Sequence, residues 1–85
     1  MNKDELLKAI KKDLRENKNQ WVYCEYIAEG KLIRYKRWNT YFQTFKVGDI
    51  NVGLPMEKNQ TEILSLISGA LNRLEDERQR IKWTY

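Results

Sequence analysis

Histidine, cysteine and proline are scarce in this 85-residue sequence, which contains none, one and one of them respectively. Without histidine, the commonest general acid or base of enzymes is missing. The lone Cys24 can form no internal disulfide and cannot by itself make a zinc site, which takes several Cys or His ligands. The four glycines occur singly, so no phosphate-binding or dinucleotide-binding glycine pattern is present. We therefore expect a protein that is not an enzyme and that uses no metal or cofactor.

Long hydrophobic runs are also absent. No stretch approaches the roughly 20 apolar residues that cross a bilayer, and the N-terminal residues do not resemble a signal peptide. A single cysteine gives no sign of the disulfide framework typical of small secreted domains. These absences predict a cytoplasmic protein that does not bind membranes.

Aromatic and charged residues are what the sequence does contain. Aromatic residues make up 12% of the chain and hydrophobic residues 41%, which is enough for one modest core in a single domain over residues 1–85. The net charge is +4, from 16 basic and 12 acidic residues. The basic excess is spread over the first two thirds of the chain, whereas dedicated nucleic-acid binders usually concentrate it on one element.

Hydrophobic periodicity predicts a helix at each end of the chain. Apolar residues recur at helical spacing over Lys3–Glu16, behind a capping residue at Asn2. A second helix begins after a cap at Asn59 or Thr61 and extends to about Lys82. The intervening sequence has the aromatic and branched composition of strands. The three predicted strands are residues 20–28, 32–38 and 41–47.

Short turns at Glu29-Gly30 and Asn39-Thr40 predict two hairpins, and Ile50 and Val52 are compatible with a short edge strand. We expect an α+β fold in the order α-β-β-β-α, with a three-stranded antiparallel sheet that carries both helices on one face. The element order is similar to that of the double-stranded-RNA-binding domain. That family opens its second helix with a lysine-rich cluster that meets phosphates. Here the corresponding stretch, residues 59–63, reads Asn-Gln-Thr-Glu-Ile, so the resemblance covers element order only.

A two-residue turn at Glu29-Gly30 would fix which side chains share a face of the first hairpin. Such a turn requires a positive φ at Glu29, so a bulged three-residue loop is the alternative. One face would be apolar and form the core: Val22, Cys24, Tyr26, Ile33 and Tyr35. The other would combine aromatic and charged side chains and face solvent, unless a different register places one or both tryptophans in the core. The predicted partner-binding residues are Trp21, Tyr23, Arg34, Lys36 and Trp38, extended at the hairpin end by Arg37 and Tyr41.

Two further segments are candidate contacts. The apolar residues Ile81, Trp83 and Tyr85 follow a charged run, and they either fold back on the sheet or form a homodimer contact. The first helix carries basic residues that could follow phosphates, but acidic residues interrupt them, which is typical of a solvated helix face. The basic residues concerned are Lys8, Lys11, Lys12 and Arg15.

Three functional hypotheses follow. The first is a small binding protein of the inhibitor or adaptor type, comparable to those of mobile elements. It would engage a protein or a nucleic-acid-handling protein complex through the aromatic and basic sheet face. The second is direct binding of double-stranded RNA or DNA through the same face and the first helix. The third is a structural homodimer built on the last helix.

Overall fold

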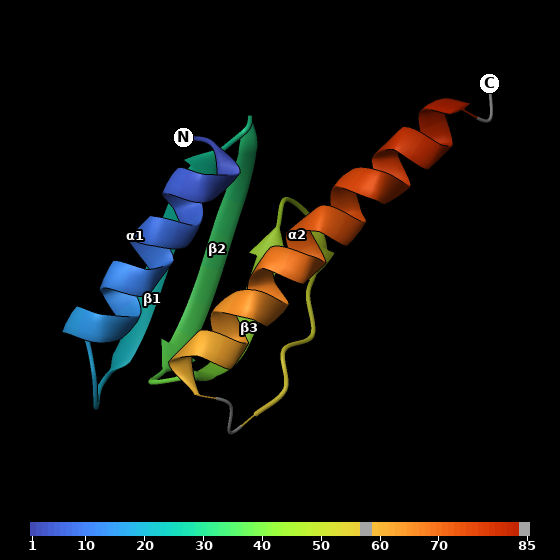
Figure 1. Ribbon diagram of the computed structural model, residues 1–85. Coiled ribbons are helices and arrows are strands. Elements are labelled where there is room, and N and C mark those ends of the chain that lie inside the picture. Colours follow the sequence, from blue (N-terminus) through green and yellow to red (C-terminus); the bar gives the residue numbers. More distant parts are fainter. Residues whose placement is uncertain (57–58, 84–85) are drawn as a thin grey trace.

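In the computed structural model the chain forms two helices and a four-stranded antiparallel sheet (Figure 1). The structure describes residues 1–56 and 59–83, and it describes side chains as far as Leu74. The element order is α-β-β-β-β-α, which confirms the α+β class and corrects the predicted strand number from three to four.

Helix α1 (Lys3–Glu16) has the bounds that the sequence predicts. The Asn2 side chain accepts a hydrogen bond from the Glu5 amide at 2.8 Å, and the Glu5 carboxylate accepts one from the Asn2 amide at 3.3 Å. This capping box satisfies two amides at the helix start. The buried apolar side chains of α1 are Leu6, Ile10 and Leu14.

The sheet consists of β1 (Trp21–Ala28), β2 (Lys31–Trp38), β3 (Tyr41–Val47) and β4 (Ile50–Asn51), paired as neighbours in chain order. The fourth strand exists because the chain reverses at Gly48, whose φ is 60°, so that Ile50 pairs with Val47. β4 lies where Ile50 and Val52 are compatible with a short edge strand, but it comprises only Ile50 and Asn51.

The first hairpin has the predicted two-residue turn. Glu29 and Gly30 have φ angles of 51° and 74°, so both central residues are left-handed, as in the turns that match the twist of a hairpin. Ala28 therefore pairs with Lys31, and Glu25 pairs with Arg34 further along. The predicted separation of an apolar and a mixed face is confirmed, and the three-residue loop is excluded.

A β-bulge in β3 shapes the core beneath the helices. Lys36 pairs with Thr44 whereas Arg37 pairs with Phe42, so Gln43 is the extra residue. As a result Phe42 and Phe45, three residues apart, are both buried. The Tyr35 ring stacks on Phe45 with centroids 5.8 Å apart and meets Phe42 edge-on at 5.1 Å.

Both helices lie on the same face of the sheet, with α1 on the side of β1 and α2 (Gln60–Trp83) in front of β3 (Figure 1). Asn59 caps α2, because its side-chain oxygen accepts a hydrogen bond from the Glu62 amide at 2.8 Å. Ile63 and Ile67 of α2 are fully buried and complete the core with α1 and the sheet. The opposite face of the sheet carries no described helix.

Candidate binding surface

The sheet face that points away from the helices, called the open face below, carries large exposed side chains. Trp21, Tyr23 and Trp38 are 49%, 60% and 40% exposed. Strand alternation and the observed pairing define this face. Its residues are Trp21, Tyr23, Glu25, Ile27, Leu32, Arg34, Lys36, Trp38, Tyr41, Thr44 and Lys46. Every residue of the predicted surface except Arg37 lies on it.

An aromatic cluster occupies the end of the open face near the β2–β3 turn. Trp21 lies opposite Trp38, which in turn lies opposite Tyr41. The Trp21 ring is 5.8 Å from Trp38 and 6.1 Å from Tyr41 between centroids, with interplanar angles of 65° in both pairs. These are edge-to-face contacts, a geometry that aromatic pairs prefer and that stabilises the cluster. The alternative in which these tryptophans enter the core is therefore wrong.

Cations lie beside the aromatic cluster. The Lys36 ammonium is 5.2 Å from the centroid of the Trp21 ring, a cation–π contact. Arg34 and Lys46 lie opposite each other on neighbouring strands of the same face. Among the described residues, none of these three cations has a carboxylate oxygen within 4.0 Å. The open face thus offers positive charge that no acidic side chain of the described chain neutralises by direct contact.

Glu25 is the acidic residue of the open face. It lies opposite Arg34 in the sheet, but its carboxylate accepts a hydrogen bond from the Tyr23 hydroxyl at 3.1 Å. Arg34 Nε is buried and has no hydrogen-bond acceptor in the described structure. The opposite charges of Glu25 and Arg34 thus lie on neighbouring strands without forming an ion pair.

Arg37 is the one predicted surface residue that the structure corrects. It is fully buried, because alternation along β2 points it to the helix side with Ile33 and Tyr35. Its Nε and one terminal nitrogen lie 2.8 Å from one carboxylate oxygen of Asp13. Its terminal nitrogens also donate to the backbone carbonyls of Asp13 at 2.8 Å and Asn39 at 3.1 Å. Arg37 therefore holds α1 on the sheet and cannot reach a partner.

Asp13 is the centre of this buried network. Its carboxylate also accepts hydrogen bonds from the Tyr35 hydroxyl at 2.5 Å and from the Asn17 side chain at 2.8 Å. Burial alone would raise the pKa of Asp13, but hydrogen bonds from Tyr35, Asn17 and Arg37, with the charge of Arg37, lower it below its ordinary value. Burial and the bond to Asp13 raise the pKa of the Tyr35 hydroxyl far above its ordinary range. The network is thus an ionised, hydrogen-bonded anchor.

The mixture of acidic and basic residues in α1 predicts a solvated helix face, whereas Asp13 is buried. A signal of this burial was present, because Asp13 lies three residues after Ile10 and seven after Leu6, on the apolar stripe of α1. An acidic residue at such a position needs a buried cation, and Arg37 has the strand parity of a core residue. Pattern alone could therefore have suggested this pair.

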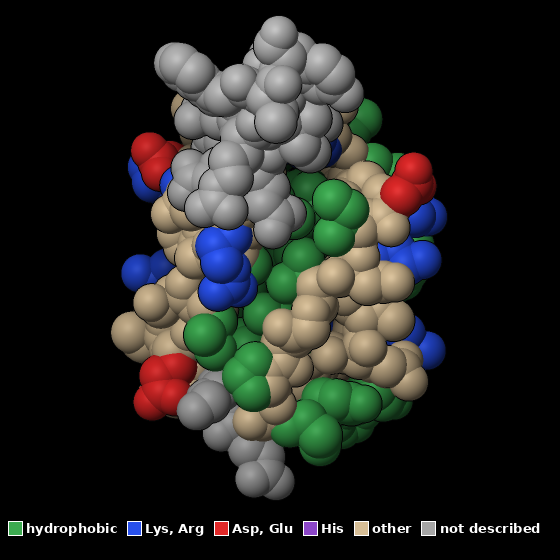
Figure 2. All heavy atoms as spheres, turned by 90° about the vertical axis from the view of Figure 1, so that its right-hand side faces the viewer, with side chains coloured by type: hydrophobic (Ala, Val, Ile, Leu, Met, Phe, Trp, Pro, Cys, Tyr) green, Lys and Arg blue, Asp and Glu red, His purple; other side chains and the backbone are tan. Residues whose placement is uncertain are grey.

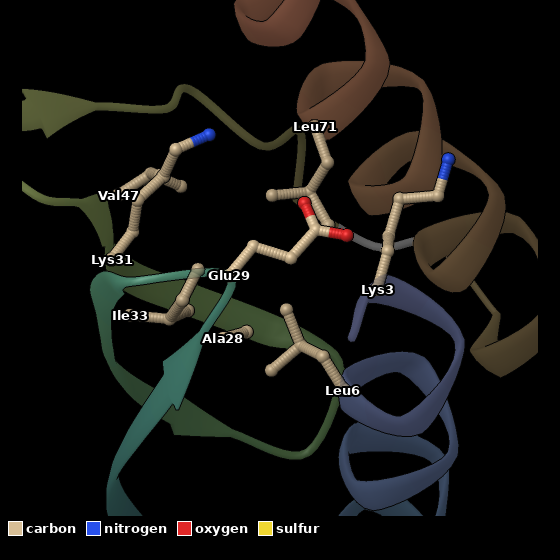
Figure 3. A pocket seen from close by; sticks show the side chains of 8 residues that line it. All are labelled: Lys3, Leu6, Ala28, Glu29, Lys31, Ile33, Val47 and Leu71. Atoms are coloured by element: carbon tan, nitrogen blue, oxygen red, sulfur yellow. The ribbon is translucent and has the colours of Figure 1, made fainter. Parts of the chain in front are cut away.

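The pockets of the described structure are too small or too open for a substrate site. The pocket in Figure 3 lies where α1, α2 and the β1–β2 turn meet, with a volume of about 20 Å³, which holds roughly one water molecule. A hollow of about 210 Å³ lies between β4 and α2, lined by residues that include Val52 and Leu74. Figure 2 shows the molecule from the right-hand side of Figure 1. On that face, hydrophobic side chains form a strip up the middle and a second group at the lower end. Small-molecule sites usually exceed about 300 Å³. A third hollow, of about 440 Å³ beside Pro55 and Leu66, exceeds that volume but is wide open to solvent.

The predicted dimer contact comprises Ile81, Trp83 and Tyr85. The side chains of Ile81 and Trp83, and the whole of Tyr85, lie outside the described part of the structure.

Among the described residues, no three or more Cys, Asp or Glu side chains are grouped to hold a metal ion. Nor does any described helix combine the length and the hydrophobicity that crossing a bilayer requires.

Comparison with protein-family models, curated proteins and solved structures gave no match for this chain.

Proposed function

We propose that this chain is a small non-catalytic binding protein that engages another protein through the open face of its sheet. The observation that carries the proposal is the aromatic cluster of Trp21, Trp38 and Tyr41, which lies at the surface although two helices cover the other face of the same sheet. Tryptophan, tyrosine and arginine are the residues enriched at the energetic centres of protein interfaces. Large apolar groups gathered in one exposed patch usually mark such a contact.

The geometry of the cluster suits tight binding. Each ring is already held edge-to-face by its neighbours, and Lys36 lies against Trp21. A partner that covers these rings therefore loses little side-chain entropy, which is one of the main costs of association. The three cations of the face favour a partner whose surface carries carboxylates around an apolar centre.

Direct nucleic-acid binding is a second candidate, because Arg34, Lys36 and Lys46 lie among aromatic rings that could stack on bases. Two features of the open face favour a protein instead. The clustered rings are tilted by 65° against each other and so do not form parallel stacking platforms. Glu25 also places a carboxylate in the middle of the face, where it would repel phosphate groups.

A binding protein that acts by occupying a surface would work as an inhibitor or an adaptor, and we place it in the cytoplasm. The absence of histidine supports the non-catalytic role, and the single cysteine supports the cytoplasmic location. The exposed aromatic and basic face supports occupation of a protein surface as the mode of action.

Capture from nuclease-treated lysate tests the proposal with matched variants. Trp38→Ala removes the centre of the cluster, and Ile50→Ala removes another exposed hydrophobic side chain that lies at the far edge of the sheet. We expect wild type and Ile50→Ala to retain the same protein at moderate salt, and Trp38→Ala to lose it. Capture that disappears on nuclease treatment and weakens steeply with salt would instead support the nucleic-acid candidate.

A further inference from the structure

The two edges of the sheet differ in their protection against pairing with another strand. On one side, the two-residue strand β4 covers β3 only at Lys46 and Val47, and the remaining edge of β3 carries the bulge at Gln43. The edge formed by β1 is eight residues long, and within it Glu25 is the one charged residue. Natural sheets usually protect such an edge with proline, lysine or a bulge, and β1 has none of these.

The pairing in the first hairpin shows which backbone groups of β1 point to its free edge. Since Ala28 and Lys31 close a two-residue turn, even-numbered residues of β1 exchange hydrogen bonds with β2 and odd-numbered residues point away. The contacts of Met1 confirm that odd-numbered residues point to the free edge. Its amine donates to the Ile27 carbonyl at 3.3 Å, and its carbonyl accepts from the Glu29 amide at 2.9 Å. Met1 therefore covers the end of the edge nearest the turn.

The rest of this edge is uncovered. In the described structure, the outward backbone groups of the next three odd-numbered residues make no hydrogen bond to any main-chain or side-chain group. These residues are Trp21, Tyr23 and Glu25. An exposed row of backbone donors and acceptors is the usual template for adding a strand.

We propose that a second copy of this chain adds to this edge, with the two β1 strands antiparallel about a twofold axis at Tyr23. The two four-stranded sheets then form one continuous sheet with all helices on the same side. Tyr23 pairs with Tyr23 of the second copy, and Trp21 pairs with Glu25 of the second copy. Every uncovered backbone group of the edge thereby gains a partner.

The structure selects this register. With the axis at Tyr23, the residue of the second copy that would face Ile27 is Asn19, whose φ of 59° turns the chain out of the strand direction. The second copy therefore leaves the edge where Met1 begins to cover it. An axis at Cys24 would require the Ile27 carbonyl, which already accepts from Met1. An axis at Val22 would leave Glu25 without a strand partner.

The side chains agree with the same register. On the helix side, Val22 lies beside Cys24 of the second copy, and both are half-buried in a single chain. On the other side the two open faces become continuous. The dimer rests on the backbone edge of β1 and does not depend on the proposed function. It would nevertheless double the open face that the proposed function uses.

Sedimentation velocity over a range of concentrations tests the dimer. We expect wild type to form a reversible species of twice the 10.3 kDa chain mass. Tyr23→Pro removes an outward-pointing amide while leaving the ladder to β2 intact, so it should be monomeric. Tyr23→Thr loses the same ring but keeps the amide, and it should still dimerise. A monomeric wild type, a dimeric Tyr23→Pro variant or a monomeric Tyr23→Thr variant that retains the fold by circular dichroism would overturn the proposal.

Cysteine cross-linking tests the register without a proline. Val22 and Cys24 of the second copy form a non-hydrogen-bonded pair, whose Cα separation of about 4.5 Å suits a disulfide. Mild oxidation of Val22→Cys should therefore link residue 22 of one chain to residue 24 of the other, as read by peptide mass mapping. Wild type and the double variant Val22→Cys/Cys24→Ser, each with one cysteine, should stay unlinked. No link in Val22→Cys, or efficient linking through Cys24 in wild type, would contradict the proposed pairing.

Discussion

Replacing Arg37 with methionine removes the cation of the buried network while keeping much of the side-chain volume. The substitution takes away every guanidinium contact, namely the ion pair with the Asp13 carboxylate and the hydrogen bonds to the backbone carbonyls of Asp13 and Asn39. Asp13 stays buried and keeps its bonds from Tyr35 and Asn17. The variant thus leaves a partly satisfied carboxylate inside the protein.

Removing one partner of a buried ion pair costs about 3–5 kcal/mol of unfolding free energy. A domain of this length has a total stability of about 4–13 kcal/mol, so the loss would consume a large part of it. The cost should depend on pH. The pKa of Asp13 is lowered in the folded wild type, so its ionised form contributes stability that is present above the unfolded pKa of about 3.8 and is lost as pH falls through the folded pKa.

In Arg37→Met the pKa of Asp13 should rise relative to wild type, because burial persists without the guanidinium. The stability difference between the two proteins should therefore shrink as the pH is lowered. Urea denaturation followed by circular dichroism, at neutral pH and at about pH 4, measures both quantities.

A matched triple variant separates the charge from the packing. Asp13→Leu, Tyr35→Phe and Arg37→Met together remove both charges and the hydroxyl that would otherwise lack an acceptor, and apolar replacement of a buried pair is often neutral or stabilising. We expect the triple variant to recover most of the loss. A loss in Arg37→Met of less than about 1 kcal/mol, or one that does not change with pH, would refute this account of the network.

Three further predictions follow from burial and capping. Tyr35→Ala should lower the unfolding free energy by about 3–5 kcal/mol, because a fully buried aromatic ring is removed, as urea titration would show. Trp38→Ala should lower it by less than about 1.5 kcal/mol in the same assay, because the ring is 40% exposed; a loss as large as that of Tyr35→Ala would place Trp38 among the core residues. Asn59→Ala should cost about 1 kcal/mol, since the Glu62 amide loses its acceptor, and Thr61→Ala should cost less; the reverse order in thermal melts would show that Thr61 is the cap.

The features that could be predicted from the sequence are those set by neighbouring residues. The capping box at Asn2 depends on residues three apart, and the Glu29-Gly30 turn depends on two adjacent residues. That turn fixes the register of the hairpin, and the register decides that Trp21 and Trp38 share the open face. The exposed location of the aromatic cluster is therefore a local property carried along two strands.

The features that escaped prediction depend on residues far apart in the chain. Asp13 and Arg37 are 24 positions apart, and neither alone reveals that the other neutralises it in the core. By residue type Arg37 is expected at the surface, although its position two residues after Tyr35 in β2 puts it on the buried side of the strand. The short strand β4 is open as a possibility in the sequence, where Ile50 and Val52 are compatible with an edge strand, but its pairing depends on Ile50 reaching Val47 in the folded sheet.

The central claim is that the open face contacts a protein partner. Its most direct test is a titration of isotope-labelled protein with the captured, nuclease-treated partner, followed by amide chemical shifts. The account predicts that the largest changes fall on Trp21, Trp38, Tyr41 and the strand residues beside them. Changes confined to α1 and α2, with the strand amides unaffected, would contradict it.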